Sequence, residues 1–284
     1  MSYRDNTLAA VLASNASSVT LDYRTEVYVE ECAFSKSVRS TRSPRTGRHG
    51  ARFTGPAKFD AGVWSATLRV RGDAWSIDEN RAAVEGVLGD LIDGDGSLTW
   101  APRRGSARAL SGLRLLDSSW KADGSSYLCS VQLESEKPYA EDTTATTVES
   151  AALTAGGGGF TVPLTIPFTL TASSGGDLSV THAGDFVQAF PILRAYGPIT
   201  NPNVILRSTD ERLVFDGSIA SGDYWEIDLF AGTVRQNGLT RVTALDVGAS
   251  TWFGIPRGTA QLQLAGAGYS ASTKLQALMK STWG

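Results

Sequence analysis

Side chains that serve as general bases or nucleophiles are sparse in this sequence. Its two histidines are His49 and His182, and the Gly-x-Ser-x-Gly turn that presents a nucleophilic serine is absent. His182 precedes Asp185 by three residues, so the two could in principle act as a base and its orienting carboxylate. A loop histidine beside an aspartate is far more often incidental. The sequence therefore predicts no histidine-dependent catalysis.

Closely spaced carboxylates could support glycoside hydrolysis, which needs two carboxyl groups facing each other across a cleft. The candidates are Glu134 with Glu136, and Asp223 with Glu226 and Asp228. Such pairs are common on strands and turns, and nothing in their spacing places two of them across a cleft. We therefore predict that the protein has no catalytic residues and is not an enzyme.

Metal and cofactor motifs are equally incomplete. Cys32 and Cys129 lie far apart with no Cys-x-x-Cys spacing, so a metal site is improbable and one disulfide stays open. Asp93–Gly96 resembles a fragment of a calcium loop, but the later acidic ligands are missing. Gly266–Ala271 imitates a dinucleotide-binding turn, yet too little chain follows for a βαβ unit. We predict no metal and no cofactor.

The bulk properties indicate protein partners. With a net charge of -3 and a pI near 5.5, the chain is not attracted as a whole to nucleic acid or to an anionic membrane. No apolar run approaches the roughly 20 residues that span a bilayer. The apolar run Leu8–Ala13 is too short for a signal peptide and is expected to be a surface or docking segment. A length of 284 residues suits two domains.

The first half has the pattern of a mainly β domain with one helix. Alternation predicts half-buried strands over Leu21–Val29 and Trp64–Val70. Ser76 and Glu79 have the spacing of a capping box at a helix start, and the helix is expected to end at Asp93–Gly96. Further strand patterns cover Leu98–Trp100, Leu113–Leu116 and Tyr127–Leu133.

A basic stretch interrupts these strands. Lys36–Lys58 contains seven basic residues and no acidic one, and its composition is expected not to order by itself. It could be a solvated loop, an assembly arm that orders against an acidic surface of a neighbouring subunit, or a nucleic-acid-binding segment whose arginines neutralise phosphates. If it is an assembly arm, reversing its arginines to glutamate should block assembly and leave a folded monomer. These arginines are Arg39, Arg42, Arg45 and Arg48.

A change of composition near residue 140 marks a domain boundary. A Thr-rich segment leads to Gly156–Gly159, which has the composition of a linker. Frequent turn signals then separate short strand patterns, as in a β-sandwich. Asn237-Gly238 is the strongest hairpin signal, and Thr273–Met279 alternates like a final strand. We predict domains over residues 1–145 and 146–284.

Four segments in order resemble siphophage distal tail proteins. Leu133–Asp142 resembles the element that closes the N-terminal domain of that family. Gly184–Pro202 is similar to its approach to a strand followed by Gly-Pro-hydrophobic-Thr-Asn-Pro. Gly222–Asp228 and Ser250–Gly258 occupy the places of a Gly then Ile-Asp strand and of a Trp-Phe then Pro-Gly turn.

The resemblance implies a split-barrel-like N-terminal β domain with one α-helix and a galectin-like C-terminal β-sandwich. It also implies a structural virion protein at the phage tail tip, made in the host cytoplasm. Such proteins form a ring, usually a hexamer, through their N-terminal domains. The implied partners are other copies of the chain, the tail tube protein, the tape measure protein and tail-tip or baseplate hub proteins, with no membrane and no sequence-specific nucleic acid.

The alternative interpretation is a carbohydrate-binding β-sandwich that attaches a tail to surface glycans. Exposed aromatic rings would hold the sugar, and Trp225 and Trp252 are the candidates. Aromatic residues on sandwich strands more often belong to the core. A third class, a tail-associated hydrolase, would turn over surface polysaccharide, and we expect no such activity.

Overall fold

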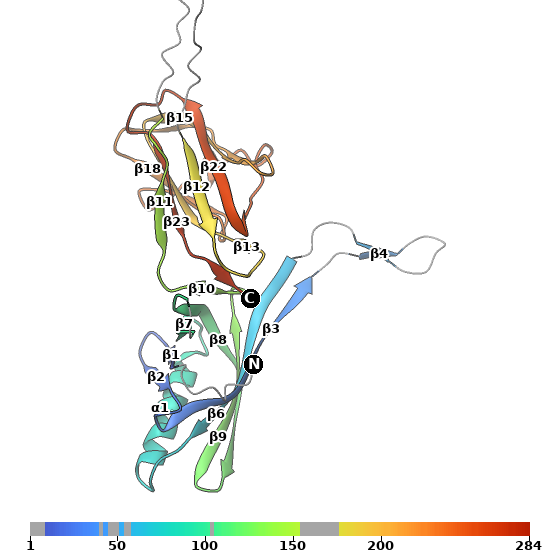
Figure 1. Ribbon diagram of the computed structural model, residues 1–284, viewed down its shortest axis with the longest axis vertical. Helices are drawn as coiled ribbons and strands as arrows, with labels where there is room; N and C mark the ends of the chain where they lie inside the picture. The colour runs from blue at the N-terminus through green and yellow to red at the C-terminus, as the bar shows by residue number, and fades with distance from the viewer. Residues whose placement is uncertain (1–8, 40–41, 45–50, 54–57, 103–104, 154–175) are drawn as a thin grey trace, which may run out of the picture. The chain divides into compact units, whose positions relative to one another are not determined.

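The computed structural model describes residues 9–39, 42–44, 51–53, 58–102, 105–153 and 176–284 (Figure 1). The chain divides into two compact units. The first comprises Met1–Thr143 with Gly284, and the second comprises Thr144–Trp283. The predicted linker at Gly156–Gly159 lies outside the described residues.

The first unit is built on one antiparallel sheet with the strand order β2-β1-β7-β8-β9-β6-β3, and β10 also pairs with β8. A separate hairpin pairs β4 with β5. The strands of this unit are β1 (Ala10–Ala13), β2 (Ser18–Leu21), β3 (Val27–Arg39), β4 (Arg42–Pro44), β5 (Ala51–Phe53), β6 (Lys58–Val70), β7 (Gly96–Trp100), β8 (Arg108–Asp123), β9 (Ser126–Ser135) and β10 (Ala140–Asp142).

One face of this sheet is covered and holds the core of the first unit. On β6 the expected alternation is confirmed, with Trp64, Ala66, Leu68 and Val70 all buried. The helix α1 (Ser76–Asp90) lies against β2 and β6, and it buries Val84, Val87 and Leu88. The opposite face of β6 carries the half-buried Ser65, Thr67 and Arg69.

The start of α1 differs from the expected capping box. Asp73 Oδ1 accepts hydrogen bonds from the backbone N–H groups of Trp75 at 3.0 Å and Ser76 at 2.9 Å. Ser76 Oγ in turn accepts the Asp73 N–H at 2.9 Å. The box is thus formed by Asp73 and Ser76, three residues earlier than the predicted Ser76 and Glu79 pair. The helix was predicted correctly and its cap was not.

The expected strand over Leu21–Val29 is also wrong, because a turn divides it. The carbonyl of Asp22 accepts the Thr25 N–H at 2.9 Å, and its Oδ1 accepts the Arg24 N–H at 3.0 Å. An aspartate that bonds the backbone two residues later favours a turn over a continuing strand. β2 therefore ends at Leu21 and β3 begins at Val27.

The basic stretch contains more regular structure than its composition suggests. β3 and β6 remain paired as far as Arg39 opposite Lys58, and β4 pairs with β5 beyond them. Strand pairing supplies the order that apolar burial alone would not. Within the stretch, residues 40–41, 45–50 and 54–57 lie outside the described residues, and these include Arg45, Arg48 and His49.

The second unit consists of two antiparallel sheets. One has the order β11-β23-β14-β18-β19-β20 and the other has the order β12-β22-β15-β16, with β17 paired to β15. The strands of the two sheets are β11 (Thr146–Glu149), β12 (Asp177–His182), β14 (Ile192–Tyr196), β15 (Ile199–Leu206), β16 (Glu211–Val214), β17 (Ser218–Ile219), β18 (Tyr224–Asp228), β19 (Thr233–Gln236), β20 (Leu239–Thr240), β22 (Gly258–Ala267) and β23 (Lys274–Met279).

Short elements complete the second unit. β13 (Gln188–Ala189) pairs with β21 (Ile255–Pro256). The remaining two are the 3-10 helix η1 (Val242–Ala244) and the strand β24 (Thr282–Trp283). Because β24 follows β23, the Thr273–Met279 pattern is a strand but not the last one. The predicted turn at Asn237-Gly238 is confirmed, with φ of 49° and 85° between β19 and β20.

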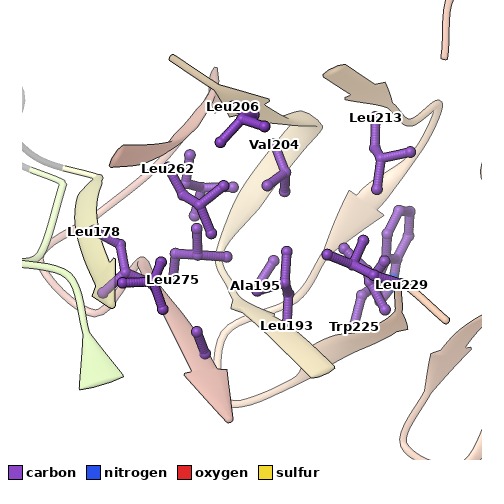
Figure 2. Close-up of a cluster of buried hydrophobic side chains, with 14 of the residues drawn as sticks. Leu178, Leu193, Ala195, Val204, Leu206, Leu213, Trp225, Leu229, Leu262 and Leu275 are labelled. Carbon is purple, nitrogen blue, oxygen red and sulfur yellow. The ribbon is translucent and has the colours of Figure 1, made fainter. Parts of the chain in front are cut away.

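The core of the second unit is sealed between its two sheets (Figure 2). Leu193 and Ala195 of β14 and Trp225 of β18 come from one sheet. Val204 of β15 and Leu262 of β22 come from the other, and all five are at most 3% exposed. Along β12 the buried Leu178 and Val180 alternate with the exposed Ser179 and Thr181, as expected of a two-sheet packing. The mainly β fold class is therefore confirmed.

Candidate interaction surfaces

The histidine considered for catalysis is part of the packing of the second unit. His182 is 1% exposed, and its Nδ1 accepts the Gly184 N–H at 3.2 Å. Its Nε2 lies 3.0 Å from the Phe186 carbonyl oxygen and 3.2 Å from Thr282 Oγ1. With Nδ1 acting as an acceptor, Nε2 carries the proton and donates to one of these oxygens. The imidazole thus links the end of β12 to β24.

The carboxylates considered for hydrolysis hold turns and strands together. Arg194 Nη2 lies 2.9 Å from the Glu226 carboxylate, across paired strands. Asp228 Oδ1 accepts the backbone N–H groups of Phe230 and Ala231, both at 2.9 Å. Asp223 accepts a hydrogen bond from Asn237 Nδ2 at 2.9 Å. These contacts give Asp223, Glu226 and Asp228 structural roles, and Glu134 and Glu136 lie on or beside β9 in the first unit.

The described part of the chain contains no group of three or more potential metal ligands. Cys32 and Cys129 are free thiols, so they form no disulfide. Burial raises the pKa of the Cys129 thiol to about 12. Among the described residues, no helix is long and apolar enough to cross a membrane.

Neither candidate tryptophan offers a free ring. Trp225 is 3% exposed and packs edge-on against Phe215, with ring centroids 5.5 Å apart. A sugar cannot stack on a ring in that position, so Trp225 belongs to the core. Trp252 is half-buried and packs against the same core cluster.

The face of the first unit's sheet opposite α1 carries exposed polar residues. Along β9, Ser130 and Gln132 are exposed on this face. Residue pairing places Gln132 beside Ser65 and Ser130 beside Thr67, so two polar rows cross β9 and β6. The surface is hollowed here into a recess of about 330 Å³. We call this recess, with Glu31 and Asp117 at its two sides, the acidic groove.

Two β-bulges bring the acidic residues of the groove onto this face. On β3 the register shifts between Val29 and Glu31, which leaves Glu31 opposite Thr67. On β8 it shifts between Leu115 and Asp117, which leaves Asp117 opposite Gln132. Without the second shift, Asp117 would pair with Val131 and point to the covered face. A bulge re-aims side chains in this way.

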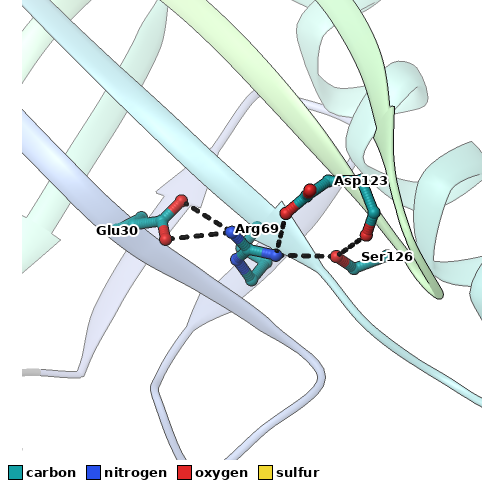
Figure 3. Close-up of polar contacts among 4 residues, drawn as sticks. All are labelled: Glu30, Arg69, Asp123 and Ser126. Carbon is teal, nitrogen blue, oxygen red and sulfur yellow. Dashed lines mark hydrogen bonds and ion pairs between the residues drawn. The ribbon is translucent and has the colours of Figure 1, made fainter.

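Arg69 lies on this same face and joins two carboxylates (Figure 3). Arg69 follows Thr67 on the same face of β6, and its Nη2 lies 3.0 Å from Glu30 of β3. Its Nη1 lies 2.7 Å from both Asp123 Oδ2 and Ser126 Oγ in the β8–β9 hairpin. Hydrogen bonds to Asp123 and then Glu30 raise the pKa of Arg69.

The carboxylates of the groove differ from those that bind Arg69. The side chains of Glu31 and Asp117 are exposed and have no ion-pair or hydrogen-bond partner among the described residues. Glu30 and Asp123 share the guanidinium of Arg69, whereas neither Glu31 nor Asp117 has a cationic partner among the described residues. Sequence alternation could not have found this pair, because it does not reveal bulges.

The sheet of the first unit also presents two long edges. β3 pairs with β6 on one side, and no other strand of the described chain pairs with it. On β8, residues 117–123 pair with β9 on one side, while β7 and β10 reach only its first half. Unpaired backbone donors and acceptors along such edges can accept a strand from another molecule.

Three solved structures and one family model resemble the chain. The crystal structure of the Dit protein of phage SPP1 matches with a TM-score of 0.62 at 14% identity, over 96% of this chain and 98% of that one. That protein is described as a paradigm of the hub adsorption apparatus in phages that infect Gram-positive bacteria. The phage P2 baseplate with Ca matches with a TM-score of 0.48 at 13% identity, over 97% and 98%. The same baseplate with Sr matches with a TM-score of 0.47 at 13% identity, over 96% and 98%.

The fold and the uncovered sheet surface define a two-unit, mainly β protein with the architecture of SPP1 Dit. Residues 183–276 match the family model for the C-terminal domain of the siphovirus-type tail component. The resemblance to siphophage distal tail proteins is therefore confirmed, and over residues 183–276 it is a likeness to a domain of a phage tail component. The search of curated proteins found no match.

Proposed function

We propose that this protein forms a ring at the distal end of a long phage tail, joins the tail tube to tail-tip components, and lines the channel used for ejection. The observation that carries the proposal is the pair of long free edges on the sheet of the first unit. A rotational ring needs two different surfaces per subunit that complement each other. The edges of β3 and β8 are two such surfaces on one sheet.

The description of SPP1 Dit as a hub supports this role, since the two chains share a fold over nearly their whole length. The proposed division of labour assigns ring formation to residues 1–145 and a peripheral sandwich to residues 146–284. The proposed partners are other copies of the chain, the tail tube, the tape measure protein and the tail-tip hub. The role is mechanical, without catalysis, metal or cofactor.

Electron microscopy of the purified full-length chain tests the proposal, with analytical ultracentrifugation to give its mass. We expect closed rings with a central opening, and we expect gold-labelled antibody against the chain to bind at the tip of intact tails. A chain that stays monomeric at every accessible concentration, or that is absent from virus particles, would contradict the proposal.

A further inference from the structure

We propose that the acidic groove of one subunit receives the basic stretch of the next subunit in the assembly. We call residues 36–58 the basic arm. The inference rests on the proposed ring. It adds the two surfaces, groove and arm, that would meet at each junction between subunits. The occupant is a defined segment of a second copy of this chain.

The charges of the two surfaces complement each other. The groove presents the unpaired carboxylates of Glu31 and Asp117 among the hydroxyl and amide groups of Ser65, Ser130 and Gln132. The basic arm has seven cationic residues, five of them arginine, and no acidic residue. An arginine fork can donate two parallel hydrogen bonds to one carboxylate, and nearby hydroxyl and amide oxygens can accept the rest.

The two bulges place both acidic residues of the groove on the same face of the sheet. Each acidic residue lies on a different strand, yet both face the same polar rows because the register shifts once on β3 and once on β8. A single unbroken ladder would turn Asp117 toward the covered face. At the neighbouring end, Glu30 and Asp123 both bind Arg69 within the chain. In the groove, Glu31 and Asp117 have no cationic partner among the described residues.

The strand geometry favours an arm from another subunit. β3 stays paired with β6 from Val27 to Arg39, so the chain is carried along the sheet away from Glu31 before the arm continues. Eight residues separate Glu31 from Arg39, which corresponds to about 26 Å at the usual strand rise of about 3.3 Å per residue. An arm that entered its own groove would have to reverse over that distance. We therefore assign the basic arm to the groove of a neighbouring subunit.

Complementary charge reversal in the full-length chain tests the inference. The groove variant carries Glu31→Lys and Asp117→Lys. The arm variant carries Arg39→Glu, Arg42→Glu, Arg45→Glu and Arg48→Glu. We expect each variant alone to raise the concentration for half-assembly about tenfold or more, because like charges meet at every junction. Wild-type assembly should weaken with added salt, as expected of exposed ion pairs.

Mixing the two variants separates an intermolecular contact from an intramolecular one. A positive groove meets a negative arm at one junction and the reverse at the next, so an equimolar mixture should assemble at nearly the wild-type concentration. Rescue in a chain that carries all six changes, without rescue in the mixture, would show that each arm occupies its own groove and would overturn the inference.

A matched control places the same charge change elsewhere on the first unit. Asp93→Lys with Glu136→Lys alters two other exposed carboxylates and should leave assembly unchanged. If the groove variant fails to show a cooperative unfolding transition, the neutral pair Glu31→Gln and Asp117→Asn replaces it, with a smaller shift and a weaker salt dependence expected. If the groove variant forms rings at the same concentration as the wild type, the groove contact is refuted. The proposal of a ring is unaffected by that result.

Discussion

The two units use antiparallel sheets in opposite ways. In the second unit, two sheets cover each other, and the inward residues of both are buried in one cluster. In the first unit, one sheet has α1 on one face, while the other face keeps a polar groove and the edges keep unpaired strands. In such a sandwich, the apolar face of each sheet is buried by the other sheet. An open sheet leaves edge N–H and C=O groups and charged side chains that another molecule can bind.

This contrast predicts that stability and the proposed assembly depend on different units. Apolar burial between sheets stabilises the second unit without a partner. The first unit has the free edges that natural proteins usually cover or shorten, since they promote association. We therefore expect substitutions in the second unit to act on folding and substitutions on the open sheet to act on assembly.

The largest effect is expected from Trp225→Ala. Removing a buried aromatic side chain leaves a cavity, and such changes typically destabilise a domain by about 3–5 kcal/mol. We expect the second unit to unfold at much lower denaturant concentration, with the first unit little affected. Urea unfolding followed separately by far-ultraviolet circular dichroism and by limited proteolysis would measure this. Simultaneous loss of both units would break the contrast between them.

Trp225→Phe provides the matched control. It preserves most of the ring that packs against Phe215 and removes an indole Nε1 that has no hydrogen-bond partner among the described residues. We expect a smaller loss than for alanine. If Trp225→Ala instead left the fold intact and abolished binding to a glycan array, the carbohydrate-binding interpretation would be favoured.

A second and smaller effect is expected from Gly184→Ala. A Cβ atom at Gly184 would lie 1.8 Å from the backbone oxygen of Thr282, so the backbone must shift. Overpacking of this kind typically costs about 1–3 kcal/mol. Gly86→Ala in α1 is the control, because a Cβ there meets nothing within 4 Å. It should stabilise the first unit by about 0.5–1 kcal/mol, because glycine disfavours a helix interior. Thermal unfolding would measure the change in stability for both variants. If Gly184→Ala and Gly86→Ala changed stability equally, the close contact at Gly184 would have no effect on folding.

Sequence periodicity predicted the parts of the fold that depend on burial. Alternation located the buried residues of β6, and the Asn237-Gly238 pair located a tight turn. It failed where a local polar contact or a long-range partner decides the structure. The helix is capped by the carboxylate of Asp73 and not by the predicted Ser76 and Glu79 pair. Pairing with β6 extends β3 into the basic stretch.

The groove could not be predicted for a related reason. Glu31 and Asp117 are 86 positions apart in the sequence, and neither belongs to a recognisable motif. They lie on one face because of two register shifts, and a register shift depends on the partner strand as much as on the strand itself. The basic arm, in contrast, could be recognised from the sequence, because its basic residues lie within one short segment.

The smallest effect concerns the pH dependence of the helix cap in the open unit. Hydrogen bonds from the backbone of Ser76 and then of Trp75 lower the pKa of Asp73. A carboxylate whose pKa is lowered on folding contributes stability that is present above its unfolded pKa of about 3.9 and is lost as the pH falls through the lower folded value. We expect Asp73→Ala to be less stable than wild type at pH 6, with the gap narrowing as the pH falls below 4. Thermal unfolding of the two proteins from pH 6 to pH 3 would measure the gap, and Asp73→Asn, which can still accept the same hydrogen bonds, should show less pH dependence at this site. A gap that stayed constant over this range would mean that the charge of Asp73 does not stabilise α1.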